Sequence, residues 1–232
     1  MFKTTLAVNT ALTLTILVAT LPNRSGNAEE TGNSVTVLHE GYLQPIKGRE
    51  PMPGVVDSGA RHVGGTIVLV RGGGITLVAD PGMVRNDALI LAALEKEGVA
   101  TDDVTHVFIS HHHPDHTMNI ALFANAALVD FWAKYSGDLW EDHGDDYELA
   151  AGIRVIQTPG HTEEDASLVV DTPEGTYVLT HAWPFSQINS SPDPLAWDQK
   201  ALDQSRARIL KIADWIIPGH GNVVPNPERA TQ

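Results

Sequence analysis

Cysteine is absent from all 232 residues of the sequence. Disulfide bonds therefore cannot stabilise the fold, and no thiolate can serve as a nucleophile or a metal ligand. Any metal or acid–base chemistry has to come from histidine and carboxylate side chains, and the chain contains 11 histidines.

Basic residues are scarce as well. Lysine and arginine number 15 against 29 aspartates and glutamates, so the formal net charge is -14. Binding to nucleic acid requires a basic surface that neutralises phosphates, and this composition disfavours one. We therefore expect a small-molecule substrate and no nucleic-acid partner.

Internal repeats and long low-complexity linkers are also missing. Hydrophobic residues make up 42% of the chain, which is enough for a sizeable core. The length suits one domain better than two.

The first 28 residues have the composition of a secretory signal peptide. Met1-Phe2-Lys3 is a short basic start, residues 4–21 are mostly apolar, and small residues precede Ala28. We expect cleavage near Ala28, a mature domain over residues 29–232, a periplasmic or secreted location and no membrane association after cleavage. An uncleaved helix or membrane anchor is the alternative. The sequence leaves the oligomeric state open.

Short apolar runs separated by glycine and proline turns predict strands. These runs are residues 35–38, 66–70, 75–79, 104–109, 127–129, 153–156, 166–170, 177–179 and 215–217. Helices are predicted over 86–97, capped by Asn86, and over 198–212, capped by Asp198, with a further helix beginning in 117–123. Many strands with few helices favour an α/β or α+β domain.

A cluster of histidines follows directly after the apolar run 104–109. It reads Ser110-His111-His112-His113-Pro114-Asp115-His116. In an extended chain residues two apart share a side, so His111 and His113 can face one point while His112 faces away. The turn at Pro114 can bring Asp115 and His116 towards the same point. Imidazole and carboxylate groups at this spacing suit Zn²⁺.

Two further histidines occur in matching contexts. His161 follows a predicted strand in Thr158-Pro159-Gly160-His161-Thr162, and His220 does so in Pro218-Gly219-His220-Gly221. An apolar strand that runs into Pro-Gly-His places an imidazole on a tight loop at the edge of a sheet, where sites are often assembled. We expect both to be metal ligands.

Together these motifs resemble the metallo-β-lactamase-fold superfamily, and within it the branch of hydroxyacylglutathione hydrolases and lactonases. The resemblance covers roughly residues 60 to 222 and implies a four-layer αββα sandwich with metals at one edge of the sheets. It also implies that His111, His113 and His161 hold one zinc, and that Asp115, His116 and His220 hold a second. Asp80 matches an early aspartate that supports the ligands in this family.

The sequence departs from that branch at one position. His181 stands where the family usually carries an aspartate that bridges both metals. A neutral imidazole cannot readily bridge two ions as a carboxylate does. We expect His181 to be a terminal ligand or a proton shuttle, with two zinc ions per chain, or one if the second site is weak.

The expected function follows from the metal. Zinc lowers the pKa of a bound water to about 7, so the prediction is a zinc-dependent hydrolase. A metal-bound hydroxide would attack the carbonyl of a small ester, thioester or lactone, with Asp115 and His181 as catalytic residues. A β-lactamase and a non-catalytic zinc-binding protein are the alternatives. Aromatic residues in 131–140 and 182–185 are candidates for the pocket wall.

Overall fold

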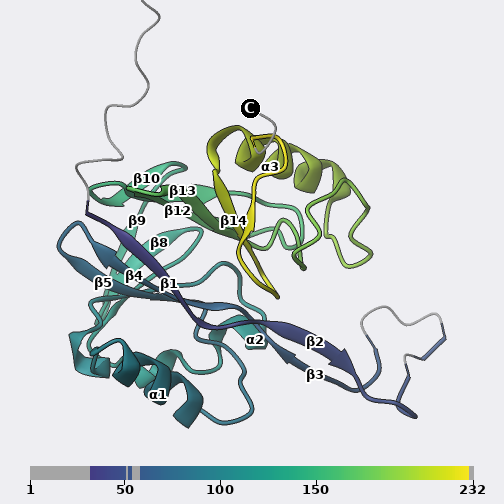
Figure 1. Ribbon diagram of the computed structural model, residues 1–232, viewed down its shortest axis with the longest axis horizontal. Helices are drawn as coiled ribbons and strands as arrows, with labels where there is room; N and C mark the ends of the chain where they lie inside the picture. Colours follow the sequence, from purple (N-terminus) through teal and green to yellow (C-terminus); the bar gives the residue numbers. More distant parts are fainter. Residues whose placement is uncertain (1–31, 51, 54–57, 230–232) are drawn as a thin grey trace, which may run out of the picture.

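Two β-sheets lie face to face in the computed structural model, which describes residues 32–50, 52–53 and 58–229 (Figure 1). The predicted signal peptide, residues 1–28, lies outside this part of the chain. None of the helices in the described ranges is long and apolar enough to cross a membrane.

The larger sheet has seven strands and the smaller has six. In spatial order the larger contains β1 (Ser34–His39), β4 (Ile67–Gly72), β5 (Ile75–Ala79), β6 (His106–Phe108), β7 (Ala127–Val129), β8 (Ala133–Ser136) and β9 (Leu139–Asp142). The smaller contains β10 (Tyr147–Ala150), β11 (Ile153–Gln157), β12 (Ala166–Thr172), β13 (Gly175–Thr180), β14 (Trp215–Pro218) and β15 (Val224–Pro225).

The remaining elements are a separate hairpin and the helices. The hairpin pairs β2 (Tyr42–Pro45) with β3 (Arg61–Gly64) and projects from the body beside α2 (Figure 1). The helices are α1 (Ala88–Lys96), α2 (Pro114–Thr117) and α3 (Gln199–Ile212), with 3-10 turns η1 (Thr101–Asp103) and η2 (Ile120–Leu122).

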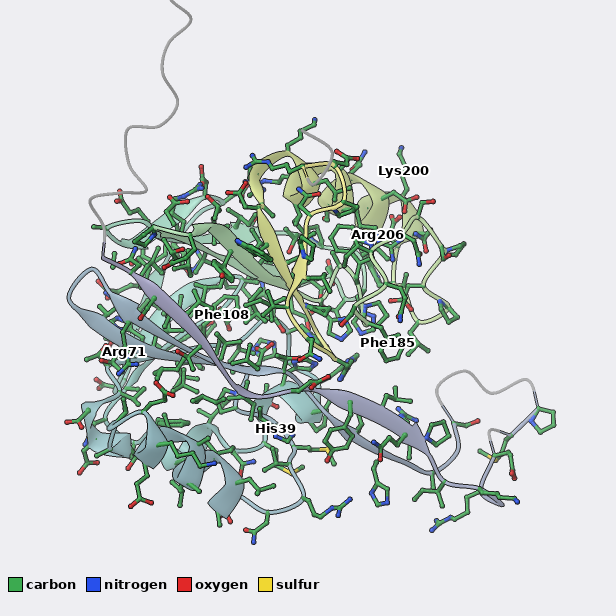
Figure 2. All side chains as sticks on the ribbon, viewed as in Figure 1. His39, Arg71, Phe108, Phe185, Lys200 and Arg206 are labelled. Carbon is green, nitrogen blue, oxygen red and sulfur yellow. The ribbon has the colours of Figure 1, made fainter. Side chains whose placement is uncertain are left out.

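Alternation along the strands divides the core into three layers. On β4, Val68 and Val70 face the inner core between the sheets, whereas Ile67 and Leu69 face α1. Phe108 of β6 belongs to the inner layer and lies between the sheets (Figure 2). A third cluster packs α3 on the outer face of the smaller sheet. The result is the four-layer αββα sandwich that the family resemblance implied.

Strand direction determines where the loops meet. β5 is parallel to β6, and β13 is parallel to β14. β11 and β13 are both antiparallel to β12, so β11 runs the same way as β13. The carboxyl ends of these strands therefore gather at one edge of each sheet, where the predicted site residues follow them.

The helix predictions were right at two places and wrong at a third. The Asp198 carboxylate caps α3 by accepting from the backbone N–H groups of Lys200 and Ala201 at 2.8 and 3.0 Å. Helix α1 lies within the predicted range 86–97. The helix predicted to begin in 117–123 does not form beyond α2. There the backbone N–H of Asn119 bonds to the carbonyl of Pro81 at 2.8 Å, which draws the chain away from a helical path.

Candidate metal centre

The site lies where loops from both sheets meet. His111 and His113 follow β6, Asp115 and His116 lie on α2, and the other three histidines follow strands of the smaller sheet. The structure brings all seven predicted metal residues together, in three overlapping groups whose donor atoms lie within 4.8 Å of one another. His111, His113 and His161 form the first group, Asp115, His116 and His220 form the second group, and the third group, His111, His116 and His181, overlaps both.

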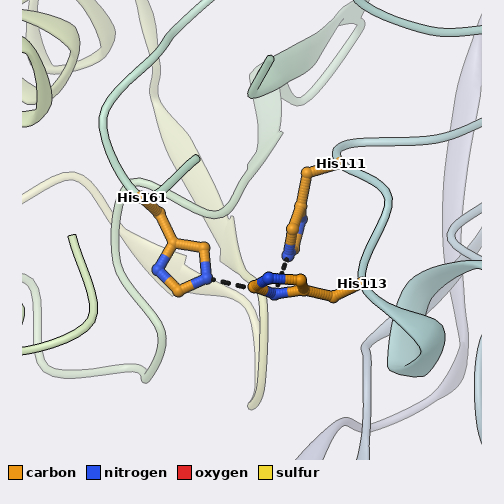
Figure 3. A group of neighbouring side chains, drawn as sticks. All are labelled: His111, His113 and His161. Carbon is orange, nitrogen blue, oxygen red and sulfur yellow. Dashed lines mark hydrogen bonds between the residues drawn. The ribbon is translucent and has the colours of Figure 1, made fainter. Parts of the chain in front are cut away.

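The first group consists of three imidazoles (Figure 3). Nδ1 of His113 lies 2.9 Å from Nε2 of His111 and 3.4 Å from Nε2 of His161. His111 and His161 are buried, whereas His113 is exposed and reaches the group from the outer side. Three nitrogens thus converge on one point from two different loops.

The second group joins a carboxylate to two imidazoles. Oδ2 of Asp115 lies 3.6 Å from Nε2 of His116 and 3.5 Å from Nε2 of His220. Asp115 comes close because Gly82 makes room for it. A Cβ at Gly82 would lie 1.7 Å from the Asp115 carbonyl oxygen, so only glycine fits there.

Hydrogen bonds fix the outward nitrogens of these rings. Nδ1 of His116 donates to Asp80 Oδ2, Nδ1 of His161 to Asp193 Oδ2, and Nδ1 of His220 to the Gly64 carbonyl, each at 2.9 Å. A carboxylate or carbonyl oxygen can only accept, so these rings carry the proton on Nδ1. The lone pair of each Nε2 is therefore directed towards the shared centre.

Asp80 connects three parts of the site. It is buried at the end of β5 with a φ of 51°, a left-handed conformation that is uncommon outside glycine. Its carboxylate accepts from the Ser110 backbone N–H and from Ser110 Oγ, both at 2.7 Å, as well as from His116. Ser110 Oγ in turn lies 3.1 Å from Nδ1 of His111. Asp80 thus orients ligands of both groups.

Burial and charge set the protonation of the cluster. Burial, together with the neighbouring imidazoles, holds the pKa of His111 and of His181 well below the usual range. The pKa of His220 is also lowered, first by burial. Burial acts against the charged form of His116 too, but the Asp80 carboxylate outweighs it and raises that pKa. Neutral imidazoles have the lone pairs that a metal requires.

His181 occupies the middle of the cluster. Its ring centre lies 4.2 Å from that of His161 and 4.5 Å from that of His111, and its Nε2 lies 3.4 Å from Nε2 of His220. The ring fits because residue 219 is glycine, where a Cβ would lie 2.3 Å from Cδ2 of His181. The histidine at the family's aspartate position therefore contacts both groups.

Asp193 is a site residue that sequence reasoning missed. It lies in the segment 182–198 between β13 and α3, and its side chain is only 5% exposed. Burial acts to raise the pKa of Asp193, but the hydrogen bond from His161 and a backbone N–H bond outweigh it and lower that pKa. Its sequence context, Pro192-Asp193-Pro194, indicates only a turn.

A cavity of about 550 Å³ opens onto the cluster. Its walls are mostly apolar, with residues from the β2–β3 hairpin on one side and from segment 182–198 on the other. The lining residues are Leu43, Arg61, Val63, Met83, His113, Pro114, Asp115, His161, His181, Pro184, Phe185, Asp193, Pro194, Leu195 and His220.

The aromatic candidates separate into two sets. Phe185 lines the cavity as expected, whereas Trp183 is buried in the core beside α3. The interpretation of 131–140 as a pocket wall was wrong, because these residues continue the larger sheet as β8 and β9. Trp132 stacks on His112, and Trp140 packs edge-on against Tyr135, away from the cavity.

The donor set fits zinc in kind and in spacing. Zn–N bonds of about 2.0–2.1 Å place two nitrogens of a tetrahedral site about 3.4 Å apart. Five pairs of donor atoms here lie 2.9 to 3.6 Å apart, and all donors of each group lie within 4.8 Å of one another. Nε2 of His116 and Nδ1 of His181 are buried without a hydrogen-bond partner among the described residues. Buried polar atoms normally have partners, and a metal ion would satisfy such lone pairs.

Comparison with known proteins identifies the family. The family model of the metallo-beta-lactamase superfamily matches residues 60–181. A Xenopus laevis protein named metallo-beta-lactamase domain-containing protein 1 is 36% identical over 215 residues, which cover 87% of this chain and 85% of that protein.

Solved structures show the same fold at lower identity. One is a Thermotoga maritima protein described as a metallo-beta-lactamase, with a TM-score of 0.62 and 18% identity over 84% of this chain and 99% of its own. Another is a quorum-quenching N-acyl homoserine lactone lactonase, with a TM-score of 0.57 and 18% identity over 81% of this chain and 91% of its own.

Proposed function

The chain belongs to the metallo-beta-lactamase superfamily, and from that premise we propose that it is a zinc-dependent hydrolase of a small ester, thioester or lactone. The observation that carries the proposal is the cluster of seven donor side chains, five of which line an apolar cavity. An apolar cavity with a few convergent polar groups is the usual form of a small-molecule site. The similarity in fold to a lactone lactonase supports the same class of substrate.

In this proposal the first and second groups are the two ligand sets, and His181 is an additional ligand through a ring nitrogen. His111, His113 and His161 would hold one zinc, and Asp115, His116 and His220 the other. Zinc bound there would act as a Lewis acid and lower the pKa of a water to about 7. The alternative is a single zinc ion per chain.

The protein's own groups handle the proton and the substrate. Asp115 is both a donor of the second group and a lining residue of the cavity, so its carboxylate can orient the attacking water and accept its proton. Burial and the neighbouring imidazoles hold the pKa of His181 well below the usual range, which favours the neutral ring, and His181 lines the same cavity. The alternative to its role as a ligand is that of a proton shuttle, in which the neutral ring would take up the proton accepted by Asp115 and pass it to the leaving group. The apolar walls hold the acyl part and exclude bulk water.

Export is part of the proposal. The apolar N-terminal run and the small residues before Ala28 support cleavage of a signal peptide. The intact mass of protein recovered from the periplasm or medium tests this, because cleavage after Ala28 removes a defined set of 28 residues. Full-length protein in the cytoplasm would contradict it.

A substrate panel with metal analysis tests the hydrolase. Purified mature protein is assayed on an ester, a thioester, a lactone and a β-lactam, and zinc per chain is measured on the same sample. We expect chelator-sensitive turnover of one of the first three. Turnover of the β-lactam alone would identify a β-lactamase. Tight zinc binding without turnover of any compound would favour the zinc-binding alternative.

A further inference from the structure

The middle histidine of the run that follows β6 faces away from the metal cluster. Within the described ranges, His112 belongs neither to the donor groups nor to the lining of the cavity. Its ring is stacked on Trp132, with ring centres 5.3 Å apart and ring planes at 16°. Its Nε2 lies 3.3 Å from Oδ2 of Asp130, and its Nδ1 lies 3.8 Å from Oε1 of Glu164. His112 is thus held from three sides, although the proposed function gives it no role.

Asp130 is a buried carboxylate that its own turn holds in place. It accepts from the backbone N–H groups of Trp132 and Ala133 at 2.9 and 3.1 Å. The O–H of Tyr135 lies 3.1 Å from both of its oxygens. Burial acts to raise the pKa of Asp130, but His112 and these N–H and O–H donors outweigh it and lower that pKa. Asp130 is therefore an ionised and well-fixed partner for His112.

The pairing of two strands brings Asp130 to the histidine run. β6 and β7 are parallel neighbours in the larger sheet, with Phe108 opposite Val129. The backbone N–H of Ile109 also donates to the Val129 carbonyl at 2.9 Å. The chain therefore leaves both strands at the same edge, where Asp130 follows β7 and the histidine run follows β6.

Glu164 brings the other sheet into contact with His112. It lies in the loop that carries His161 and leads into β12. This loop is closed by Asp165, whose carboxylate accepts from the backbone N–H and the Oγ1 of Thr162 at 2.7 and 2.9 Å. His112 therefore lies between the turn after β7 and the loop that supplies the third histidine of the first group.

Alternation along the chain couples His112 to the ligands on either side of it. The backbone of His113 is extended, with φ and ψ of -66° and 145°. In an extended segment neighbouring side chains point to opposite sides, and residues two apart share a side. Nε2 of His111 and Nδ1 of His113 lie 2.9 Å apart on the cluster side. A rotation of the backbone at His112 would turn both rings, so a hold on His112 fixes both.

We propose that Asp130 is a positioning residue for the metal centre, because it holds His112 and so sets the directions of the two ligand histidines that flank it. The inference rests on the proposed function in one respect, namely that the first group binds a metal ion. Asp130 contacts neither the metal nor the substrate in this assignment. Its effect passes through the side chain and the backbone of His112.

The test measures the binding of cobalt(II), whose visible absorption reports the geometry of its ligands. Metal-free protein is titrated with Co²⁺, and urea titration compares the stability of each variant. Asp130→Asn keeps an oxygen for the backbone N–H groups but removes the charge beside His112. His112→Asn removes the ring, and the double variant completes a mutant cycle. The matched control is Asp142→Asn, the same charge change at an exposed position of β9.

We expect the wild type and Asp142→Asn to bind Co²⁺ equally well. Asp130→Asn and His112→Asn should each weaken one binding step by about 10-fold, the lower end of the range for groups that support metal ligands. The double variant should lose no more than either single variant, because the two residues act in series. Asp193→Ala, which leaves His161 without its acceptor, should weaken the same step and so assign it to the first group.

Three results would count against this role. Equal Co²⁺ affinity and absorption in the wild type and Asp130→Asn would overturn it. Additive losses in the double variant would do so as well, because Asp130 would then act on the fold without His112. A wild type that binds neither Co²⁺ nor Zn²⁺ would overturn both this inference and the proposed function. Binding that changes as expected, in a protein that hydrolyses nothing in the substrate panel, would contradict the hydrolase alone.

Discussion

Three imidazoles of the cluster have one nitrogen tied to an oxygen acceptor and the other directed at the centre. Such outer hydrogen bonds set the tautomer and the orientation of a metal-binding histidine. The acceptors come from distant parts of the chain, the Gly64 carbonyl being 156 positions from His220. At the scale of single residues, the hydrogen-bond acceptors of the ligand histidines therefore define the site as much as the ligands do.

Asp115 provides the most direct test of the chemistry. Asp115→Ala removes the carboxylate that lines the cavity and faces His116 and His220. We expect kcat to fall by at least about 100-fold, the scale of a lost general base. Steady-state kinetics on the best substrate of the panel would show this. Asp138→Asn, at an exposed position, serves as the control, and unchanged turnover in Asp115→Ala would refute the assignment.

His181 is tested by metal stoichiometry rather than by rate. Its ring contacts members of both groups, so His181→Ala should lower zinc content from about two ions per chain towards one. His181→Asp restores a carboxylate that can bridge two ions and should retain both. Elemental analysis after dialysis measures the content, and circular dichroism checks folding. Full zinc content in His181→Ala would exclude His181 as a ligand.

At the scale of elements, segment 182–198 forms one wall of the cavity and supports the cluster. Pro184 and Leu195 line the cavity, and Asp193 holds His161. Behind the segment, the buried Arg206 of α3 donates to the carbonyls of Ala182 and Ser191 at 2.8 and 2.9 Å. Helix α3 thus holds the start and the middle of this segment.

Loss of Asp193 should weaken zinc binding without disturbing the second group. Asp193→Ala leaves Nδ1 of His161 without its acceptor, and outer partners of this kind typically contribute 10- to 100-fold in metal affinity. Competition with a chromophoric chelator measures the loss. Glu163→Gln, an exposed neighbour of the histidine loop, should bind zinc as the wild type does. Equal affinity in Asp193→Ala would mean that His161 does not need this partner.

Arg206 should contribute to stability far more than a surface arginine of the same helix. Arg206→Met leaves two backbone carbonyls without their charged donor, which we expect to cost about 3 kcal/mol in the free energy of unfolding. Arg208→Met removes a partly exposed pairing with Asp145 and should cost about 1 kcal/mol or less. Urea titration of both variants makes the comparison, and equal losses would contradict this account of α3.

At the scale of the whole molecule, the two sheets contribute different parts of one site. The larger sheet supplies the histidine cluster after β6, and the smaller supplies the histidines after β11, β13 and β14. Because neither sheet holds a complete donor set, the sheets must be packed together before zinc can bind as proposed. Metal binding and folding are then linked.

Removal of zinc should therefore lower the thermal stability of the whole domain. Free zinc at a thousandfold excess over Kd raises the free energy of unfolding by about 4 kcal/mol. This corresponds to a rise in Tm of roughly 8 to 16 °C for a chain of this size. Calorimetry after treatment with a chelator and after re-addition of zinc measures the difference. The same Tm with and without metal would show that the cluster does not bind zinc under those conditions.

Much of this protein could be predicted from local sequence. The strands, the cap at Asp198 and the spacing of His111, His113 and Asp115 each depend on a few neighbouring residues, so their periodicity and turn chemistry indicate them directly. The prediction that the segment with Trp132 and Trp140 forms a wall of the pocket was wrong, because an aromatic run does not reveal which sheet it extends. The continuation of the larger sheet by β8 and β9 depends on pairing with β7.

By itself the sequence determined the types of donor and their positions at strand ends, because ligand chemistry and strand alternation are local properties. The tertiary structure alone decided the partners. Asp193 lies 32 positions from His161, and the hairpin that contains Arg61 reaches the cavity only because its base is bonded to Asp115 and His220. Such contacts arise when separate loops meet at one edge of two packed sheets, and no short-range pattern in the chain encodes that meeting.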